Sequence, residues 1–371
     1  MNDMIPTIDL FAGAGGIGIG AHIAGGRLLL SLEIDELCCI TLEQNPDAHP
    51  GKVITGDVEA FNGQELREMV GLSSNDPLVI IGGPPCQPFS KASYWTDPGE
   101  DSRYRQARAN GIDIEKPTPI LNAKDDERRN LVDTFLNRVI EANADGFLME
   151  NVASILHPRN KSIIDDFIKK AEYHGYKCNL VKANAADYGV PQTRQRVFVL
   201  AAKSKHPLTP MPTHSDQLSD GQFEINMSNY ITAGDAICDF SSDEYFEPEE
   251  VVSGKWEKEL SEIPPGMNYK ALSAWAGHPN PVFVAETRFW NFLLKLSPYK
   301  PSWTIAASPG PWTGPFHWNG RRLRTTEMAA LQTFPKTYQF AGTRRERVKQ
   351  IGNAAPPLLV KHMIEQVYDA V

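Results

Sequence analysis

The alternation of short apolar runs with helical segments over the first 205 residues most constrains the fold of this chain. Glycine, proline or an acidic residue bounds most of these runs. Parallel strands need a crossover between them, so the alternation predicts a doubly wound, mostly parallel α/β sheet. The expected strands are residues 7–11, 28–34, 52–54, 78–81, 146–149, 178–183 and 197–201, and the expected helices are 36–45, 131–142, 161–174, 325–334 and 357–371, besides one that ends near Gly25.

The pattern changes after about residue 205. Residues 206–320 are rich in proline, serine, asparagine, tryptophan and acidic side chains, with little periodicity. A chain of 371 residues is long enough for two or three domains. We therefore expect a sheet domain of residues 1–205, completed by 340–371, and a smaller irregular domain of residues 206–339.

Candidate functional residues stand where the predicted strands end. Gly13, Glu33, Asp57, Cys86 and Glu150 each follow such a strand. Ligands of doubly wound sheets collect at the carboxyl ends of the strands. The sequence therefore predicts that these five residues meet at one edge of the sheet.

The loop after the first strand, from Gly13 to Gly18, satisfies G-x-G-x-x-G and opens a helix. Its glycines let a ligand approach the backbone, and Glu33 can accept hydrogen bonds from ribose hydroxyls. This unit alone fits a nicotinamide cofactor and S-adenosylmethionine equally well. It also fits a tight turn between strand and helix that binds no ligand. Asp57 favours an adenosine ligand, because its carboxylate can accept a hydrogen bond from the adenine amino group. A role in a turn or as a helix cap is an equal interpretation of this aspartate.

The segment from Gly82 to Ser90, GGPPCQPFS, is the most informative one. Its single cysteine, Cys86, stands among three prolines that fix the local backbone. A cysteine in a rigid loop at the ligand edge is a candidate nucleophile if its pKa is lowered. We interpret the other four cysteines as structural or incidental: Cys38, Cys39, Cys178 and Cys238.

Composition excludes several classes of protein. Five cysteines without metal-type spacing predict neither a disulfide framework nor a metal site, and favour a reducing cytoplasm. Without an apolar run of about 18 residues or a signal-type N-terminus, we expect no membrane span and no secretory signal. The net charge of -9 argues weakly against nucleic acid, but the cations between Arg321 and Lys349 permit a basic face. The acidic stretch 239–262 is interpreted as a solvated face.

Six motifs carry a resemblance to a known family. They are residues 9–16 (DLFAGAGG), 84–87 (PPCQ), 150–152 (ENV), 188–198 (YGVPQTRQRVF), 322–335 and 350–357 (QIGNAAPP). They resemble the motifs of the cytosine C5-methyltransferase family, and they stand in the family's order. The resemblance covers residues 7–202 and about 300–371. It implies the fold of S-adenosylmethionine-dependent methyltransferases and methyl transfer to carbon 5 of a flipped cytosine in a specific double-stranded DNA sequence.

The resemblance assigns the chemistry to four residues. Cys86 would add to carbon 6 of cytosine, which makes carbon 5 nucleophilic. Glu150 would protonate or hydrogen-bond N3, for which a raised pKa is expected. Arg196 would bind the cytosine O2, and Arg194 would support the loop and the nearby carboxylate. Taken singly, the glutamate fits a helix cap and the arginines fit surface charges. The base that removes the carbon-5 proton is not identified.

The same resemblance implies the cofactor-binding residues. Phe11 would pack on adenine, Gly13 and Gly15 would approach the methionine end, and Glu33 would hold the ribose. The full expected set is Phe11, Ala12, Gly13, Ala14, Gly15, Gly16, Glu33, Ile34, Asp57, Val58, Pro84, Asn353 and Ala354. Ile34 departs from the aromatic residue that family members often carry there, which weakens the stacking contact.

For DNA, residues 91–129 would form the loop that closes on the duplex, although this segment is longer than the family's usual loop. Its basic and aromatic side chains suit a nucleic acid backbone, and an ordinary solvated insertion is an equal interpretation. They are Tyr94, Trp95, Arg103, Tyr104, Arg105 and Arg108. Residues 206–339 would be the target recognition domain, reading bases in the major groove, but the sequence gives no specificity code.

Three alternatives stay open at this point. A transfer RNA C5-methyltransferase is disfavoured by Gln87 and by the long recognition region, and a catalytically silent DNA-binding regulator by the intact Cys86, Glu150 and Arg196. A nicotinamide-dependent oxidoreductase gives PPCQ no role. We expect a cytoplasmic monomer that acts on double-stranded DNA, with a possible cognate restriction endonuclease as partner.

Overall fold

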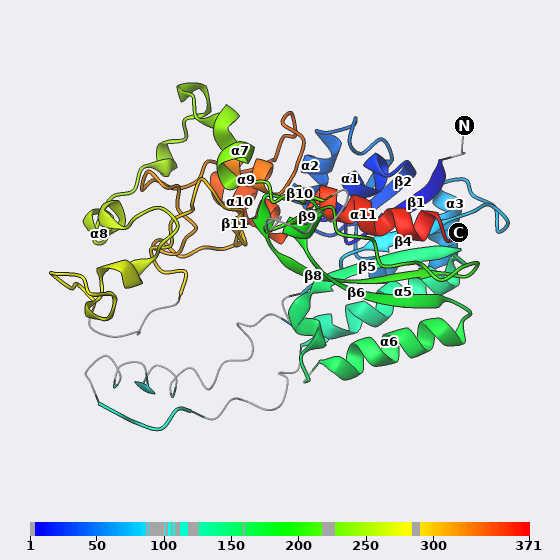
Figure 1. Cartoon of the computed structure of the whole chain (residues 1–371). Coiled ribbons are helices and arrows are strands. Elements are labelled where there is room, and N and C mark those ends of the chain that lie inside the picture. The colour runs from blue at the N-terminus through cyan, green and yellow to red at the C-terminus, as the bar shows by residue number, and fades with distance from the viewer. Residues whose placement is uncertain are drawn as a thin grey trace.

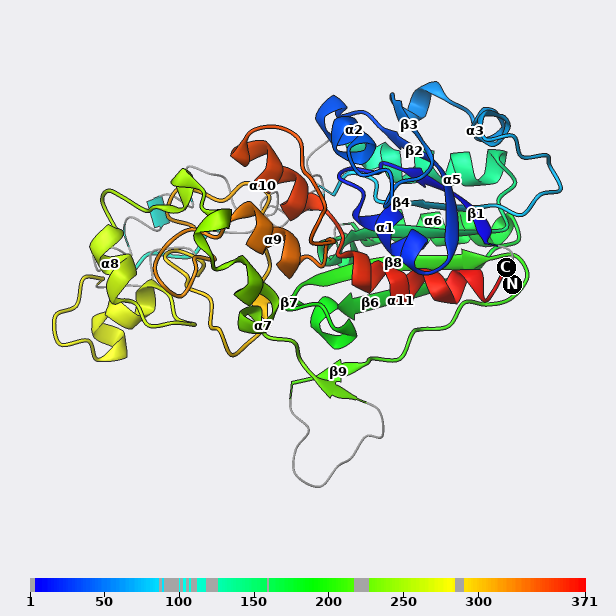
Figure 2. The same ribbon diagram turned by 90° about the horizontal axis from the view of Figure 1, so that it is seen from above.

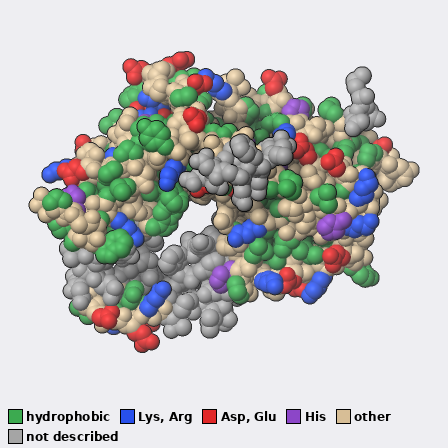
Figure 3. All heavy atoms as spheres, in the orientation of Figure 1, with side chains coloured by type: hydrophobic (Ala, Val, Ile, Leu, Met, Phe, Trp, Pro, Cys, Tyr) green, Lys and Arg blue, Asp and Glu red, His purple; other side chains and the backbone are tan. Residues whose placement is uncertain are grey.

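The computed structural model describes residues 4–86, 89, 100, 103–104, 107, 112–117, 126–158, 160–216, 227–283 and 290–371. Within these residues the chain forms an α/β lobe and an irregular lobe, with the chain termini together on the α/β lobe (Figure 1). The described side chains of the two lobes border an open cleft (Figure 3). Of the segment 91–129, the expected contacts Tyr94, Trp95, Arg105 and Arg108 lie outside the described residues, as does Gln87.

A seven-stranded sheet forms the centre of the α/β lobe, in the order β3-β2-β1-β4-β5-β8-β6. Its strands are β1 (Ile5–Leu10), β2 (Gly26–Glu33), β3 (Lys52–Thr55), β4 (Val79–Gly82), β5 (Gly146–Val152), β6 (Lys177–Asn184) and β8 (Gln195–Ala202). All neighbours pair in parallel except β8, which is antiparallel to both β5 and β6. The predicted doubly wound, mostly parallel sheet is therefore confirmed.

Helices cover both faces of this sheet (Figures 1 and 2). One face packs on α1 (Gly16–Ile23) and α11 (Pro357–Tyr368), and the other on α3 (Gly63–Met69), α5 (Leu131–Glu141) and α6 (Lys161–Tyr173). The alternation within each strand makes two cores, because successive side chains point to opposite faces. In β4, for example, Ile80 joins the α5 side, while Val79 and Ile81 join the α1 side. The helix α2 (Glu36–Glu43) packs beside β2 and β3.

The rest of the described chain forms short elements and two further cores, one of which reaches the α/β lobe. Its elements are α7 (Ala233–Ile237), α8 (Glu257–Glu262), α9 (Thr325–Leu331), α10 (Arg344–Asn353) and the two-residue strands β7 (Gln192–Thr193), β9 (His214–Ser215), β10 (Ser228–Asn229) and β11 (Ser302–Trp303). One core joins α9 and α10 to Ile19 of α1, and the other is built of aromatic and aliphatic residues between 252 and 316. The pair β7–β11 connects the lobes, because β7 leads directly into β8.

The expected helix 325–334 ends earlier, at Leu331. Thr333 adopts a left-handed backbone with a φ of 64°, and Pro335 follows, so the helix cannot continue. Conversely, β5 extends past the expected end at residue 149 and contains Glu150. These are shifts of element ends, while the expected strands and helices are all present.

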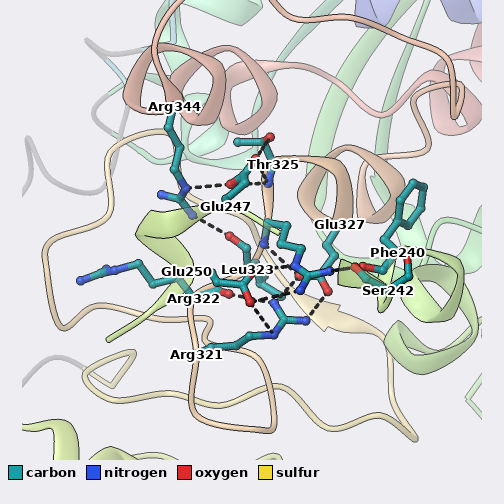
Figure 4. A network of polar contacts seen from close by, with 11 residues as sticks. Phe240, Ser242, Glu247, Glu250, Arg321, Arg322, Leu323, Thr325, Glu327 and Arg344 are labelled. Atoms are coloured by element: carbon teal, nitrogen blue, oxygen red, sulfur yellow. Dashed lines mark hydrogen bonds and ion pairs between the residues drawn. The ribbon is translucent and has the colours of Figure 1, made fainter. Parts of the chain in front are cut away.

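A buried network of ions ties the acidic stretch of the irregular lobe to α9 and α10 (Figure 4). Arg324 contacts both oxygens of Glu250 and donates to the carbonyls of Phe240 and Ser242 at 2.7 Å. Arg321 forms a two-pronged pair with Glu327, at 2.9 and 2.6 Å. A buried charge is tolerated where partners neutralise it, and each charge here has one.

Glu247 completes this network. It accepts from the Thr325 backbone at 3.1 Å and from Arg344 Nε at 2.9 Å, and Arg344 also donates to the Leu323 carbonyl at 2.6 Å. The interpretation of 239–262 as a solvated face is therefore wrong for Glu247 and Glu250, since both neutralise arginines. The same pairs remove Arg321, Arg324 and Arg344 from the basic face expected between residues 321 and 349.

Candidate active site

Two adjoining cavities open at the carboxyl ends of the parallel strands. The first, of about 280 Å³, lies between the loops after β1 and β4 and the end of α10. The second, of about 540 Å³, extends past the ends of β2 and β3. Four residues line both: Phe11, Glu33, Ile34 and Pro85. Every residue of the expected cofactor set lines one of the two cavities except Gly15.

The glycine loop, residues 11–16, forms one wall of the first cavity. Gly13 has a φ of 53°, and the position of a Cβ there would have no atom within 4 Å, so its backbone is open to a ligand. Gly15 has a φ of 85°, and a Cβ there would lie 2.2 Å from His49 Nε2. Gly15 thus faces the protein interior rather than the cavity.

Two acids stand at the far side of the glycine loop. Glu33 accepts from Gly13 N at 2.7 Å, Ile34 N at 2.9 Å and Asp35 N at 2.8 Å, so it fixes the loop against the end of β2. Asp57 lines the second cavity and caps a 3₁₀ helix by accepting from Glu59 N at 2.9 Å. The capping interpretation of Asp57 therefore holds, while its carboxylate still borders the cavity.

Apolar side chains complete the second cavity. Val58 is buried in the core behind the wall, whereas Ile34 is 66% exposed. Phe11 is half-buried with a φ of 58°, a left-handed backbone that is uncommon for an aromatic residue. Such backbone strain concentrates at ligand sites.

The loop after β4 carries Cys86 to the first cavity. Pro84 is buried, and its carbonyl accepts from Asn151 Nδ2 at 3.1 Å, which ties this loop to the end of β5. A Cβ at Gly83 would lie 3.3 Å from Glu150 Oε2, so only glycine lets this carboxylate pack here without a shift. Sequence analysis gave Asn151 no role, although its place beside Glu150 in the ENV motif was a signal.

Glu150 and Arg196 form a buried ion pair. Arg196 Nε lies 2.7 Å from Glu150 Oε1, and Arg196 also donates to the Gln195 carbonyl at 2.8 Å. The antiparallel register pairs Arg196 with Val152, which puts its side chain diagonally beside Glu150 on the same sheet face. Burial raises the pKa of Glu150 above its ordinary value, and the charges of Arg196 and Arg194 oppose this only in part.

The thiol of Cys86 is not activated in this structure. Burial raises its pKa, the Glu150 carboxylate raises it further, and Arg196 and Arg194 lower it less. The expected condition, a lowered pKa, is therefore not met, because the loop leaves the thiol half-buried beside a carboxylate. A nucleophilic Cys86 must lose its proton in a complex that changes these surroundings.

Arg194 supports backbone rather than contacting the carboxylate. Its guanidinium donates to the carbonyls of Gly352 at 2.7 Å, Ala354 at 3.0 Å and Ile305 at 3.2 Å. Gln332 also donates to Ala354, and Gln192 bridges Gln332, Leu331 and Ile305. Arg194 is thus a positioning residue that fixes the end of α10, where Asn353 and Ala354 line the first cavity.

The lining residues that were not predicted from the sequence include Lys349 and Cys38. Lys349 of α10 pairs with Asp35 at 3.1 Å across the rim of the first cavity. Cys38 also lines this cavity, and burial together with Glu33 raises the pKa of its thiol far above the ordinary value. A protonated thiol of this kind is a structural side chain, in keeping with the interpretation from its helix.

Neither a metal site nor a membrane helix is found among the residues that the structure describes. No group of three or more His, Cys, Asp or Glu side chains there is arranged to hold a metal ion. Within the same ranges no helix is long and apolar enough to cross a membrane.

Comparison with known proteins identifies the family. The family profile described as C-5 cytosine-specific DNA methylase matches residues 5–369. The type II methyltransferase M.SacI of Streptomyces achromogenes is 32% identical, with 99% of this chain and 94% of that protein covered. M.NgoFVII of Neisseria gonorrhoeae, also a type II methyltransferase, is 28% identical over 97% of this chain and 85% of its own length.

Solved structures show the same fold. A putative DNA modification methyltransferase from an Escherichia coli prophage superposes with a TM-score of 0.65 at 20% identity, covering 99% of both chains. The Dnmt2 methyltransferase of Schizosaccharomyces pombe gives 0.57 at 12% identity, over 99% of this chain and 98% of its own. The expected methyltransferase fold is thereby confirmed. Because the family profile spans nearly all of the sequence, the chain belongs to the C-5 cytosine-specific DNA methylase family, enzymes that transfer a methyl group to cytosine in DNA.

Proposed function

We propose that this chain transfers the methyl group of S-adenosylmethionine to carbon 5 of a cytosine that has left a DNA duplex, through a covalent bond between Cys86 and carbon 6. The observation that carries the proposal is that a single cavity is lined by Gly13, Glu33, Cys86 and Glu150. A cofactor loop and a thiol–carboxyl pair facing one space are what a methyl transfer to a bound base requires.

The cofactor would bind along the two cavities. The open backbone at Gly13 suits the methionine end, the carboxylate of Glu33 suits ribose hydroxyls, and Asp57 with Val58 and Phe11 suits an adenine. The polar and apolar groups that line the two cavities thus fit S-adenosylmethionine, which has hydrogen-bonding groups and an apolar ring. When bound, this cofactor supplies an electrophilic methyl group on a sulfonium.

The chain's own residues would activate the base. Cys86 gives its proton to water and forms a bond from sulfur to carbon 6, while protonated Glu150 gives its proton to N3. The electron pair of the 5,6 double bond shifts between carbons 4 and 5, and the resulting enamine makes carbon 5 nucleophilic. Arg196 orients Glu150 and offers donors to the cytosine O2. After carbon 5 is methylated, loss of its proton re-forms the double bond and expels the Cys86 thiolate, and N3 returns its proton to Glu150.

We further propose that the target cytosine flips out of the duplex. Carbons 5 and 6 are covered by neighbouring bases inside a stack, and Cys86 lies in a concave cavity at the end of a sheet. Residues 206–339 would serve as the target recognition domain, facing the α/β lobe across the cleft. The matched relatives are named type II methyltransferases, so we propose a place for this chain beside a cognate restriction endonuclease.

The experiment is transfer of labelled methyl from S-adenosylmethionine to mixed-sequence duplex DNA, with transfer RNA in parallel and bisulfite sequencing of the DNA. We expect label on DNA alone, with methylcytosine at one fixed sequence. Cys86→Ser should remove transfer, whereas the matched control Cys178→Ser, at a half-buried cysteine of β6, should keep it. Label on RNA alone, or normal turnover of Cys86→Ser, would contradict the proposal.

A further inference from the structure

A buried polar cluster lies behind the glycine loop, on the side away from the cavities. Its members are Asp9 near the end of β1, His49 in the turn after α2, and Tyr338 in the connection between α9 and α10. All three side chains are buried. None lines either cavity, so a contact with substrate does not account for them.

The hydrogen bonds of this cluster have a single consistent direction. The Ala14 carbonyl in the glycine loop can only accept, so Tyr338, 2.9 Å away, donates its one hydroxyl proton there. The Tyr338 oxygen must then accept from His49 Nε2 at 3.0 Å. Burial, together with the nearby His22, lowers the pKa of His49 to about 4. The imidazole is therefore neutral near pH 7, and its Nδ1 is a bare acceptor.

Both ends of the gap between His49 and Asp9 lack a partner. Among the described residues, no group makes a hydrogen bond within distance and angle limits to Asp9 Oδ1, Asp9 Oδ2 or His49 Nδ1. The backbone N–H of Gly18 is close enough to lower the pKa of Asp9 but does not meet those limits. Yet the two groups face one position: a Cβ at Gly18 would lie 2.9 Å from Asp9 Oδ2 and 3.3 Å from His49 Nδ1. Asp9 Oδ2 and His49 Nδ1 therefore lie within about 6 Å of each other, a distance that one bridging water molecule or a rotation of either side chain can span.

We propose that Asp9 is a neutral carboxylic acid that donates a hydrogen bond toward His49 Nδ1, and that the chain Asp9–His49–Tyr338–Ala14 positions the glycine loop for its ligand. These are positioning residues, since none contacts the reacting atoms. That the ligand is S-adenosylmethionine rests on the proposed function. Gly18, the last glycine of the loop motif, keeps the space between the two groups free.

The surroundings of Asp9 favour its protonated form. Burial raises the pKa of Asp9 well above its ordinary value, Glu33 raises it further, and the Gly18 backbone N–H lowers it less. The titratable groups that face the cluster are Glu33 from β2, His22 from α1, Cys38 from α2, Tyr368 from α11 and Tyr338 itself. A buried carboxyl next to a second acid retains its proton, and a protonated carboxyl is the donor that His49 Nδ1 lacks.

The chain of hydrogen bonds also connects the two lobes. Tyr338 belongs to the core that contains α9 and α10, while Ala14 belongs to the cofactor loop. A movement of the α9–α10 connection would therefore shift the glycine loop through the hydrogen bond of the Tyr338 hydroxyl. Ionisation of Asp9 at alkaline pH removes the donor at the start of the chain, so ligand affinity should fall as pH rises through the pKa of Asp9.

The first test is independent of any ligand. In protein labelled with ¹⁵N-histidine, the signals lost in His49→Gln identify His49. We expect the neutral Nε2–H tautomer near pH 7, and an imidazolium only near the lowered pKa of about 4. An Nδ1–H tautomer, or an imidazolium that would mark an ionised Asp9 as its partner, overturns the proposal.

The second test measures the Kd of S-adenosylhomocysteine from about pH 6 to about pH 10. Asp9→Asn, whose amide donates at every pH, should bind within about threefold of the parent near pH 7 and lose the alkaline decline. Asp9→Val and Tyr338→Phe, which break the chain, should bind about tenfold more weakly. Tyr368→Phe is the matched control: the hydroxyl of this half-buried residue bonds Thr7 at 2.9 Å and takes no part in the chain, so the affinity of the variant for S-adenosylhomocysteine should be unchanged.

The outcomes separate the two proposals. Equal losses in Asp9→Asn and Asp9→Val would show that an ionised carboxylate is needed, and unchanged binding in Tyr338→Phe would show that the chain does not position the loop; either overturns the inference. If Asp9→Val does not fold, Asp9→Asn and Tyr338→Phe still decide. Failure of the parent protein to bind S-adenosylhomocysteine would instead count against the proposed function, while the histidine signals still test the chain.

Discussion

At the residue scale, the contact between Glu150 and Arg196 is the feature that bears most directly on the proposed reaction. The two side chains meet at 2.7 Å in a buried setting, yet the pKa of Glu150 is raised. A raised pKa favours uptake of a proton, so this carboxyl is better suited to pass a proton to a base than a glutamate of ordinary pKa. Burial therefore accounts for why this residue type works at this position.

Replacing Glu150 tests that role. Glu150→Gln keeps the size of the side chain but cannot transfer a proton, so kcat should fall by a factor of about 10² to 10⁴. The Kd of S-adenosylhomocysteine should stay close to that of the parent. Glu172→Gln, an exposed change on α6, is the matched control. Equal kcat values for Glu150→Gln and the parent would remove the carboxyl from the mechanism.

At the element scale, the acidic stretch 239–250 is anchored to α9 and α10 by arginine–carboxylate pairs (Figure 4). Burial alone would raise the pKa of Glu250, but the contacts with Arg324 and the charge of Arg321 lower it below its ordinary value. Glu250 therefore stabilises the fold while it is ionised. Its contribution is complete above the unfolded-state pKa, near 4.5, and is lost as pH falls through the lower folded-state pKa.

The prediction concerns stability in acid. Glu250→Gln leaves Arg324 without its charge partner, so the free energy of unfolding near pH 7 should fall by about 3 kcal/mol. The gap to the parent should narrow as pH drops below about 4. Glu249→Gln, exposed one position away, should change the free energy of unfolding by less than about 0.5 kcal/mol. Denaturant titrations at several pH values measure all three proteins, and a constant gap would contradict the account.

Elements of the sheet were predictable because their signals are local. Apolar runs ended by glycine or an acid predicted each strand, and strand ends predicted that Gly13, Glu33, Cys86 and Glu150 share an edge. The irregular lobe was not predictable in this way. The structure of this lobe depends on ion pairs between residues far apart in the sequence, such as Glu250 with Arg324. Composition alone suggested a solvated acidic face.

At the scale of the whole molecule, charge illustrates the same limit. The net charge of -9 says little about DNA, because the cations of residues 321–349 divide between internal pairs and exposed positions. Arg345 stays exposed, whereas Arg321 and Arg324 are neutralised inside the irregular lobe. The domain limits, the monomeric state and the role of residues 91–129 stay predictions.

Burial also explains why the thiol could not be judged from the sequence. A rigid proline-rich loop predicted a nucleophile, but the loop leaves Cys86 half-buried beside Glu150, and both effects raise the pKa of its thiol. We propose that the thiol is activated in the assembled complex, when the base and the DNA backbone reach the cavity. The central claim is that, in this complex, the sulfur of Cys86 bonds to carbon 6 of the cytosine.

The most direct measurement is capture of that bond. In duplex DNA containing 5-fluorocytosine, carbon 5 has no proton to lose after methylation, so the Cys86 thiolate cannot be expelled. With S-adenosylmethionine present, we expect a protein–DNA adduct that survives denaturation and that peptide mass spectrometry assigns to Cys86, absent in Cys86→Ser and retained in Cys178→Ser. An adduct at another residue, or methylation of normal DNA with no adduct on the fluorinated duplex, would contradict the account.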